Sequence, residues 1–158
     1  MKYKRFEDLP VWKDASNLAL EVFTFVDTEG FPGPYALKDQ LLRAALSISN
    51  NIAEGFERGT NQELLTFLYI ARGSAGEVRS MLCLLQRMPK AKTLESGILN
   101  LKSKAESISR QLGAWIASIK NSDYKGERFA TDKVKHADLA ARDRKAYLVE
   151  LKKFREQA

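Results

Sequence analysis

Amide, hydroxyl and carboxylate side chains interrupt an apolar helical pattern near the middle of this chain. The segment S-I-S-N-N-I-A-E-G-F-E-R-G, residues 47–59, sets Asn51 and Glu54 beside Ile48 and Ile52. Side chains of these types can carry out acid–base chemistry, contact a partner, or bond to one another as a structural network inside the fold. The rest of the residue inventory has to decide among these three uses.

The spacing of the polar residues favours the structural network. Positions 43, 47, 51 and 54 are separated by four, four and three residues, which places them on one face of a helix. A short link at residues 55–61 predicts an antiparallel neighbouring helix that brings position 74 opposite 47, and 77 opposite 43. We interpret the set as an internal polar ladder made of Arg43, Ser47, Asn51, Glu54, Ser74 and Glu77.

Each member of the ladder has an expected partner. A guanidinium near a core needs a carboxylate within bidentate reach, so we expect Arg43 to pair with Glu77. We expect Asn51 and Glu54 to bond backbone groups where one helix ends and the next begins. Contact with a partner protein is the alternative use of the same side chains.

The inventory argues against catalysis and against a bound cofactor or metal. The single histidine, His136, lies in the charged C-terminal part without a ligand set at metal-binding spacing. No nucleophile elbow, P-loop or zinc-protease motif is present. The stretch R-G-S-A-G-E, residues 72–77, resembles a phosphate loop, but it lies inside a helical pattern where Gly73 and Gly76 would permit close helix packing. Cys83, in M-L-C-L-L, is expected to be a buried thiol.

Four long helical patterns position these residues. Apolar residues recur at three- and four-residue steps over residues 11–25, 35–53, 62–87 and 94–119. Asp8, Thr60 or Asn61, and Thr93 are the expected N-caps, and Gly55 and Gly59 are expected to stop the second helix. The sequence therefore predicts an all-α, antiparallel up-down-up-down four-helix bundle over residues 1–120. Residues 121–158 are predicted to form a linker followed by a charged C-terminal helix.

The charge of the chain is compatible with nucleic acid. Residues 1–120 hold 16 basic and 13 acidic residues, for a net +3, and residues 121–158 hold 10 and 7, for another +3. No apolar run approaches the roughly 20 residues that cross a bilayer, and no signal peptide is recognisable, so we expect a cytoplasmic protein. Basic residues off the apolar stripes are the candidate nucleic-acid contacts, with a solvated surface as the alternative for each: Lys2, Lys4, Arg5, Arg72, Arg79, Lys102, Lys104, Arg110 and Lys120.

Three ordered motifs resemble a known bacterial family. They are F-E-D-L-P-V-W-K (residues 6–13), F-P-G-P-Y-A-L-K-D-Q-L-L-R-A-A-L-S-I-S-N-N-I-A-E-G-F-E-R-G (residues 31–59) and F-L-Y-I-A-R-G-S-A-G-E (residues 67–77). Over about residues 6–120 the chain is similar to the 23S rRNA intervening-sequence proteins, which are four-helix bundles related to the accessory protein of diversity-generating retroelements. The motif residues fall on Trp12, Arg43, Asn51, Glu54, Gly55, Arg58, Ser74 and Glu77.

The resemblance implies a non-enzymatic homopentamer with a basic surface and a role connected with RNA. Two apolar faces on each of the second and third helices also favour self-association, because surplus apolar surface must be covered. RNA or another nucleic acid is the first expected partner. The alternative is a protein-interaction scaffold, for example for a reverse transcriptase or a ribosomal component, that binds no nucleic acid itself.

Overall fold

The computed structural model describes residues 3–121 and Arg144. The four main helices are α1 (Pro10–Val26), α2 (Tyr35–Glu57), α3 (Asn61–Gln86) and α4 (Glu95–Lys120). Two short 3-10 helices, η1 (Phe6–Asp8) and η2 (Pro89–Leu94), precede α1 and α4. Apart from Asn121 and Arg144, the predicted linker and C-terminal helix, with His136, lie outside the described residues, and so does Lys2.

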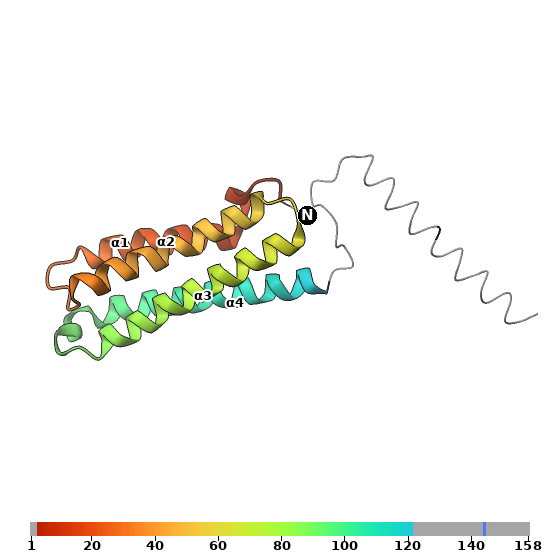
Figure 1. Cartoon of the computed structure of the whole chain (residues 1–158). Helices are drawn as coiled ribbons and strands as arrows, with labels where there is room; N and C mark the ends of the chain where they lie inside the picture. The colour runs from red at the N-terminus through yellow and green to blue at the C-terminus, as the bar shows by residue number, and fades with distance from the viewer. Residues whose placement is uncertain (1–2, 122–143, 145–158) are drawn as a thin grey trace, which may run out of the picture. The chain divides into compact units, whose positions relative to one another are not determined.

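Consecutive helices run in alternating directions, as the ribbon in Figure 1 shows. Each helix packs against the next along the chain, and α1 also packs against α4, while the diagonal pairs make no close backbone contact within residues 3–121. This portion contains helices and no strands. The predicted all-α fold with four long helices is therefore confirmed.

Local sequence signals place the helix ends, although not always as expected. Pro10 occupies the first turn of α1, and Leu9 rather than Asp8 is its N-cap residue. Thr60 caps α3 by accepting a hydrogen bond from the backbone N–H of Glu63 at 3.2 Å, as predicted. Thr93 does not cap α4, because the backbone there is already wound into η2. The helix α2 continues through Gly55 to Glu57 instead of ending before it.

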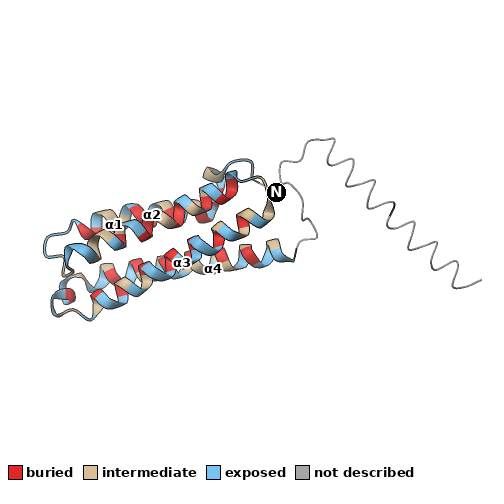
Figure 2. Cartoon of the chain, in the orientation of Figure 1, coloured by how far each residue is buried: buried red, intermediate tan, exposed pale blue. Residues whose placement is uncertain are grey.

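The apolar stripes of the four helices meet along the centre of the bundle (Figure 2). The largest side chains that are fully buried are mostly leucine and isoleucine, with Phe56 beside them. Burying one such side chain contributes about 1.5–3 kcal/mol, whereas an exposed ion pair contributes about 0–1 kcal/mol. The core, rather than the surface charges, holds these helices together.

Gly55 marks the closest packing of α2 against α3. A methyl group built on Gly55 would lie 2.6 Å from Cβ of Phe67 and 3.3 Å from a Leu64 methyl. Gly73 and Gly76 differ, since a methyl group on either meets nothing within 4 Å. The expectation that they permit close helix packing was wrong, because both lie on the exposed side of α3.

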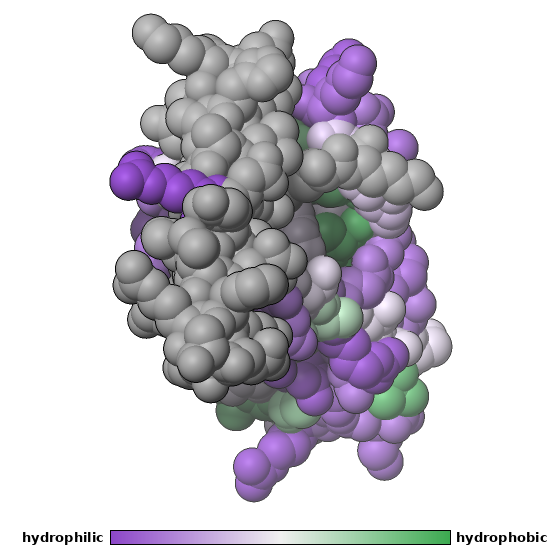
Figure 3. All heavy atoms as spheres, turned by 90° about the vertical axis from the view of Figure 1, so that its right-hand side faces the viewer, coloured by the Kyte–Doolittle hydropathy of each residue, from purple (hydrophilic) through white to green (hydrophobic). Residues whose placement is uncertain are grey.

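Hydrophilic side chains make up most of the visible surface at one end of the bundle. Viewed from the end where α2 leads into α3, small hydrophobic patches are scattered among hydrophilic side chains (Figure 3). No helix within the described residues has the length and apolar character required to span a membrane.

Replacing Gly55 and Gly73 by alanine should have opposite effects on stability. Gly55→Ala forces α2 and α3 apart and should lower the free energy of unfolding by about 1–3 kcal/mol. Gly73→Ala adds helix propensity in open space and should raise it by about 0.5–1 kcal/mol. Urea unfolding followed by circular dichroism measures both, and equal effects would contradict the close packing at Gly55.

Candidate nucleic-acid interface

Ser47, Ser74 and Asn51 form a hydrogen-bonded group between α2 and α3. The two serine hydroxyls are 2.8 Å apart. The amide nitrogen of Asn51 donates to the Ser47 backbone carbonyl at 2.7 Å and to the Ser47 hydroxyl at 2.9 Å. Ser74 is buried, and the other two are half-buried. These bonds hold α2 and α3 in one register, because sliding either helix would leave the hydroxyl of Ser74 without this partner.

The predicted Arg43–Glu77 ion pair is absent, and that part of the ladder was wrong. Both side chains are exposed, and neither forms an ion pair with any residue in the described part of the chain. The physical reason is helix geometry. Each four-residue step turns about 40° around the axis, so Arg43 is rotated about 80° away from Asn51 and faces outward.

Glu54 belongs to a different cluster, at the corner between α2 and α3. Its carboxylate accepts a hydrogen bond from Arg58 at 2.7 Å, and Arg58 also lies 3.5 Å from Glu63. The guanidinium stands 4.8 Å from the centroid of the Phe67 ring, and hydrogen bonding to Glu54 raises the pKa of Arg58. Neither Asn51 nor Glu54 bonds the backbone of the corner as predicted: Asn51 bonds back into its own helix instead.

Basic side chains gather along the seam between α3 and α4, which we call the α3–α4 basic groove. Its cations are Arg72 and Arg79 from α3, and Lys102, Arg110 and Lys120 from α4. A shallow pocket of about 500 Å³ occupies part of it, with an exposed thiol at its edge; Gly76, Arg79, Ser80, Cys83, Lys102 and Glu106 line the pocket. The expectation that Cys83 is buried was therefore wrong.

One carboxylate lies among these cations. Glu106 accepts a hydrogen bond from Arg110 at 3.0 Å and lies 4.0 Å from Arg79. Lys102 bonds the neutral side chain of Gln86 at 2.8 Å, and Lys120 stands 5.5 Å from the centroid of the Tyr69 ring. Five cations and one carboxylate leave this seam with a clear positive excess.

Gly113 positions Arg72 at the surface of α4. A methyl group built on Gly113 would lie 3.4 Å from the central guanidinium carbon of Arg72, and 3.6 and 3.7 Å from its terminal nitrogens. These nearly equal distances show the guanidinium lying face-on against α4. The glycine thus lets Arg72 remain extended across the seam and exposed.

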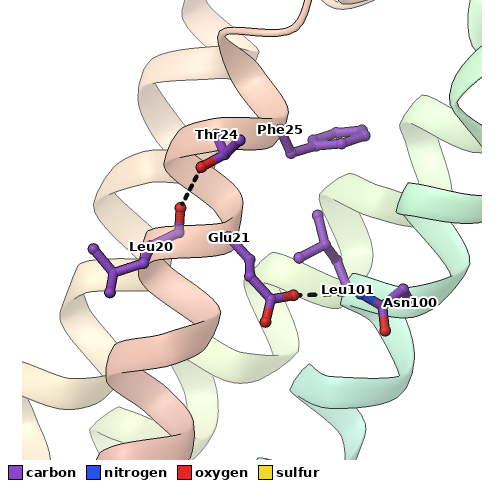
Figure 4. Close-up of a pocket in the computed structure, with 6 residues that line it drawn as sticks. All are labelled: Leu20, Glu21, Thr24, Phe25, Asn100 and Leu101. Atoms are coloured by element: carbon purple, nitrogen blue, oxygen red, sulfur yellow. Dashed lines mark hydrogen bonds between the residues drawn. The ribbon is translucent and has the colours of Figure 1, made fainter.

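Lys104 lies on the opposite side of α4 and does not belong to the groove. It pairs with Glu21 of α1, which also accepts a hydrogen bond from Asn100 (Figure 4). Lys104 is two residues from Lys102, which turns it by about 200° around the helix. At the N-terminus Lys4 is exposed, and Arg5 pairs with Glu7 at 2.7 Å, which raises the pKa of Arg5 and lowers that of Glu7.

The described residues contain no group of three or more metal-binding side chains. The α1–α4 seam carries two further pockets, whose charged lining consists of Asp14, Glu21 and Lys104. Reasoning from the sequence missed three residues of the α3–α4 seam: Tyr69, Gly113 and Glu106. These residues could have been predicted to lie together by aligning α3 and α4 as antiparallel neighbours, as the sequence analysis does for the second and third helices.

Comparison with known proteins finds a matching family and similar solved structures. The family described as 23S rRNA-intervening sequence protein matches residues 7–114. A crystal structure of a protein of unknown function from the S23 ribosomal protein family of Bacteroides thetaiotaomicron is similar at 22% identity and a TM-score of 0.60, covering 67% of this chain and 97% of the other. No curated protein matches the sequence. At this identity the solved structure supports the fold alone.

Asn51→Ala should destabilise the protein more than Asn50→Ala. Both changes have the same effect on helix propensity, but only Asn51 bonds Ser47, whereas Asn50 is exposed. We expect Asn51→Ala to cost about 1 kcal/mol beyond the effect of Asn50→Ala, measured by urea unfolding. Identical midpoints would mean that the hydrogen-bonded group does not stabilise the pairing of α2 with α3.

Proposed function

Because the chain belongs to the 23S rRNA-intervening sequence protein family, we propose that it is a non-enzymatic cytoplasmic protein that binds RNA through the α3–α4 basic groove. The observation that carries the proposal is the gathering of Arg72, Arg79, Lys102, Arg110 and Lys120 along one seam. Phosphate groups supply most of the affinity of such contacts, and arginine can bind a phosphate in a bidentate manner.

The distribution of partners within the fold supports this choice of surface. On the α1–α4 seam the cation Lys104 is paired with Glu21, so its charge is offset within the protein. On the α3–α4 seam Arg72 and Lys120 have no carboxylate partner among residues 3–121. Cations without a carboxylate partner are free to replace counterions around a phosphate chain, and Arg79, which stands 4.0 Å from Glu106, is held less closely than Lys104 is by Glu21.

The absence of catalysis is part of the proposal. In the described part of the chain, the Thr60 hydroxyl bonds the Glu63 carboxylate at 2.9 Å, but this pair forms the cap of α3, while the carboxylates of Glu54, Glu21 and Glu106 bond cations. The exposed thiol of Cys83 has no hydrogen bond to the other residues that the structure describes. The side chains of the groove are suited to attracting anions and holding them.

A second surface favours self-association. The outer face of α2 and α3 exposes Ile70 and Leu84, at 46% and 50% of their surfaces, beside the charges of Arg43 and Glu77. Exposed apolar side chains flanked by charges without partners in the described chain are typical of an interface. We propose that this α2–α3 outer face contacts another copy in a ring, for which the family resemblance implies five copies.

The same face favours the second candidate function. A scaffold for a partner such as a reverse transcriptase or a ribosomal component would use Ile70 and Leu84 as apolar anchors and would not require the basic groove. RNA binding therefore requires the α3–α4 basic groove, whereas a scaffold requires the α2–α3 outer face. Variants of the two surfaces distinguish the two functions.

Neutralising Arg79 should weaken RNA binding, whereas neutralising Lys104 should not. Fluorescence anisotropy with a short labelled RNA hairpin that carries a single-stranded overhang measures the affinity of each variant. Arg79→Gln should lower the affinity and reduce the slope of log K against log salt by about one. Lys104→Gln removes the same charge from the α1–α4 seam, so a parallel loss in both variants would contradict a specific groove. No binding by the native protein at low salt would reject the RNA function altogether.

Ile70→Lys should reduce the mass of the assembly in solution, and Leu99→Lys should leave it unchanged. The two leucine-sized side chains are equally exposed, at 46% and 48%, but Leu99 lies on α4 away from the α2–α3 outer face. Multi-angle light scattering gives the mass directly. A native protein that is monomeric at all concentrations, or a Leu99→Lys variant that dissociates as readily, would contradict the assignment of this face.

A further inference from the structure

We infer that the α3–α4 basic groove takes an unpaired stretch of RNA, with one base stacked on the exposed ring of Tyr69. The inference rests on the proposed RNA function and specifies the form of RNA that the groove accepts. It depends on an aromatic ring, a lysine and an arginine that lie together at one end of the groove.

Tyr69 is an aromatic residue left outside the core on the side of α3 that faces α4. It is 45% exposed, although its helix buries Leu68 and Ala71 completely on either side of it. The ammonium of Lys120 stands 5.5 Å from the centroid of the Tyr69 ring. The ring is therefore a solvated platform with a cation already drawn to its π face.

Arg72 lies one turn further along the same helix. Its guanidinium lies against the backbone at Gly113, and the residue as a whole remains exposed. Because Gly113 has no side chain, the guanidinium of Arg72 can lie directly against α4. A nucleotide whose base lies on the Tyr69 ring thus finds Arg72 and Lys120 as cations for its adjacent phosphates.

The groove continues from this end toward the other cations. Arg79 follows Arg72 by seven residues, which is about 10 Å along the helix axis, and Lys102 lies beyond it near Gln86. The pocket that Gly76 lines lies between Arg79 and Lys102, and Gly76 has no side chain to fill it. An RNA strand with one base stacked on Tyr69 can therefore extend along this groove, with its phosphates near Arg72, Arg79 and Lys102 in turn.

An exposed aromatic ring distinguishes an unpaired strand from a duplex. Bases in an A-form duplex are stacked on one another, so their faces are closed to a side chain, and the duplex is recognised by its shape and backbone. In a single strand or loop, a base face is available for stacking on an aromatic ring beside a basic groove. Tyr69 should therefore not contribute to the binding of a duplex, but it should contribute a stacking contact to the binding of a single strand.

The test uses the full chain and two fluorescent RNA probes: a single strand of about ten nucleotides and a blunt duplex of about ten base pairs. The variants are Tyr69→Ala, Tyr69→Phe, which keeps the ring, and Tyr35→Ala. Tyr35 is a matched exposed tyrosine, 82% exposed, at the start of α2. Circular dichroism and light scattering check that each variant keeps its fold and assembly.

We expect Tyr69→Ala to weaken binding of the single strand by about tenfold, which corresponds to the loss of one stacked base. Tyr69→Phe and Tyr35→Ala should bind like the native protein, and duplex binding should be the same for every variant. A 2-aminopurine in the single strand should lose fluorescence on binding to the native protein, and should keep more of it with Tyr69→Ala.

The other outcomes distinguish a failure of base stacking on Tyr69 from a failure of RNA binding by the groove. If Tyr69→Ala binds the single strand as tightly as the native protein while Arg79→Gln is weakened, stacking is overturned and the groove stands. If the native protein binds neither probe at low salt, the RNA function itself fails, and the inference fails with it. If Tyr69→Ala changes the mass of the assembly, the ring belongs to an interface between copies, which also overturns the inference.

Discussion

The close packing of α2 against α3 is the constraint on which the other features of this protein depend. At Gly55 the two helices approach until only a hydrogen atom fits between Gly55 and the Cβ of Phe67. About two turns earlier in α2, the hydroxyls of Ser47 and Ser74 meet at 2.8 Å. The first contact sets the distance between the helices and the second sets their register. Once α3 is held in this way, its opposite side carries Arg72 and Arg79 toward α4.

The helices were predictable because apolar periodicity reports directly which face of a helix is buried. Most residues of the predicted stripes are buried, from Leu18 in α1 to Leu112 in α4, although Ile70 of the α3 stripe is 46% exposed. The ends were less predictable, because caps are decided by local backbone geometry. Gly55 was expected to end α2 as a flexible residue, but its role is to leave space for Phe67. A glycine selected for its small size and one selected for its backbone freedom look the same in a sequence.

The candidate site was predictable only in part, because polar contacts depend on angles that residue spacing does not resolve. The facing of Ser47 and Ser74 followed from the length of the corner, since both lie near the seam. Arg43 and Glu77 occupy the same level of the seam but point outward. Lys102 and Lys104 are neighbours in sequence, yet they lie on two different seams, and only one contributes to the groove. Arg58 gathers Glu54 and Glu63 around it because the corner folds back within reach of its long side chain.

The seam between α1 and α4 differs from the others because it joins the first and last of the four helices. Asp14 bonds Gln111, and Glu21 bonds Asn100, across about 80 to 100 positions of the chain. During synthesis, α1, α2 and α3 emerge in order and can pair as neighbours, but this seam has no second side until α4 arrives. The groove that α4 shares with α3 is completed in the same event. A nascent chain therefore completes the α3–α4 basic groove, the surface proposed to bind RNA, only when α4 packs and the fold closes.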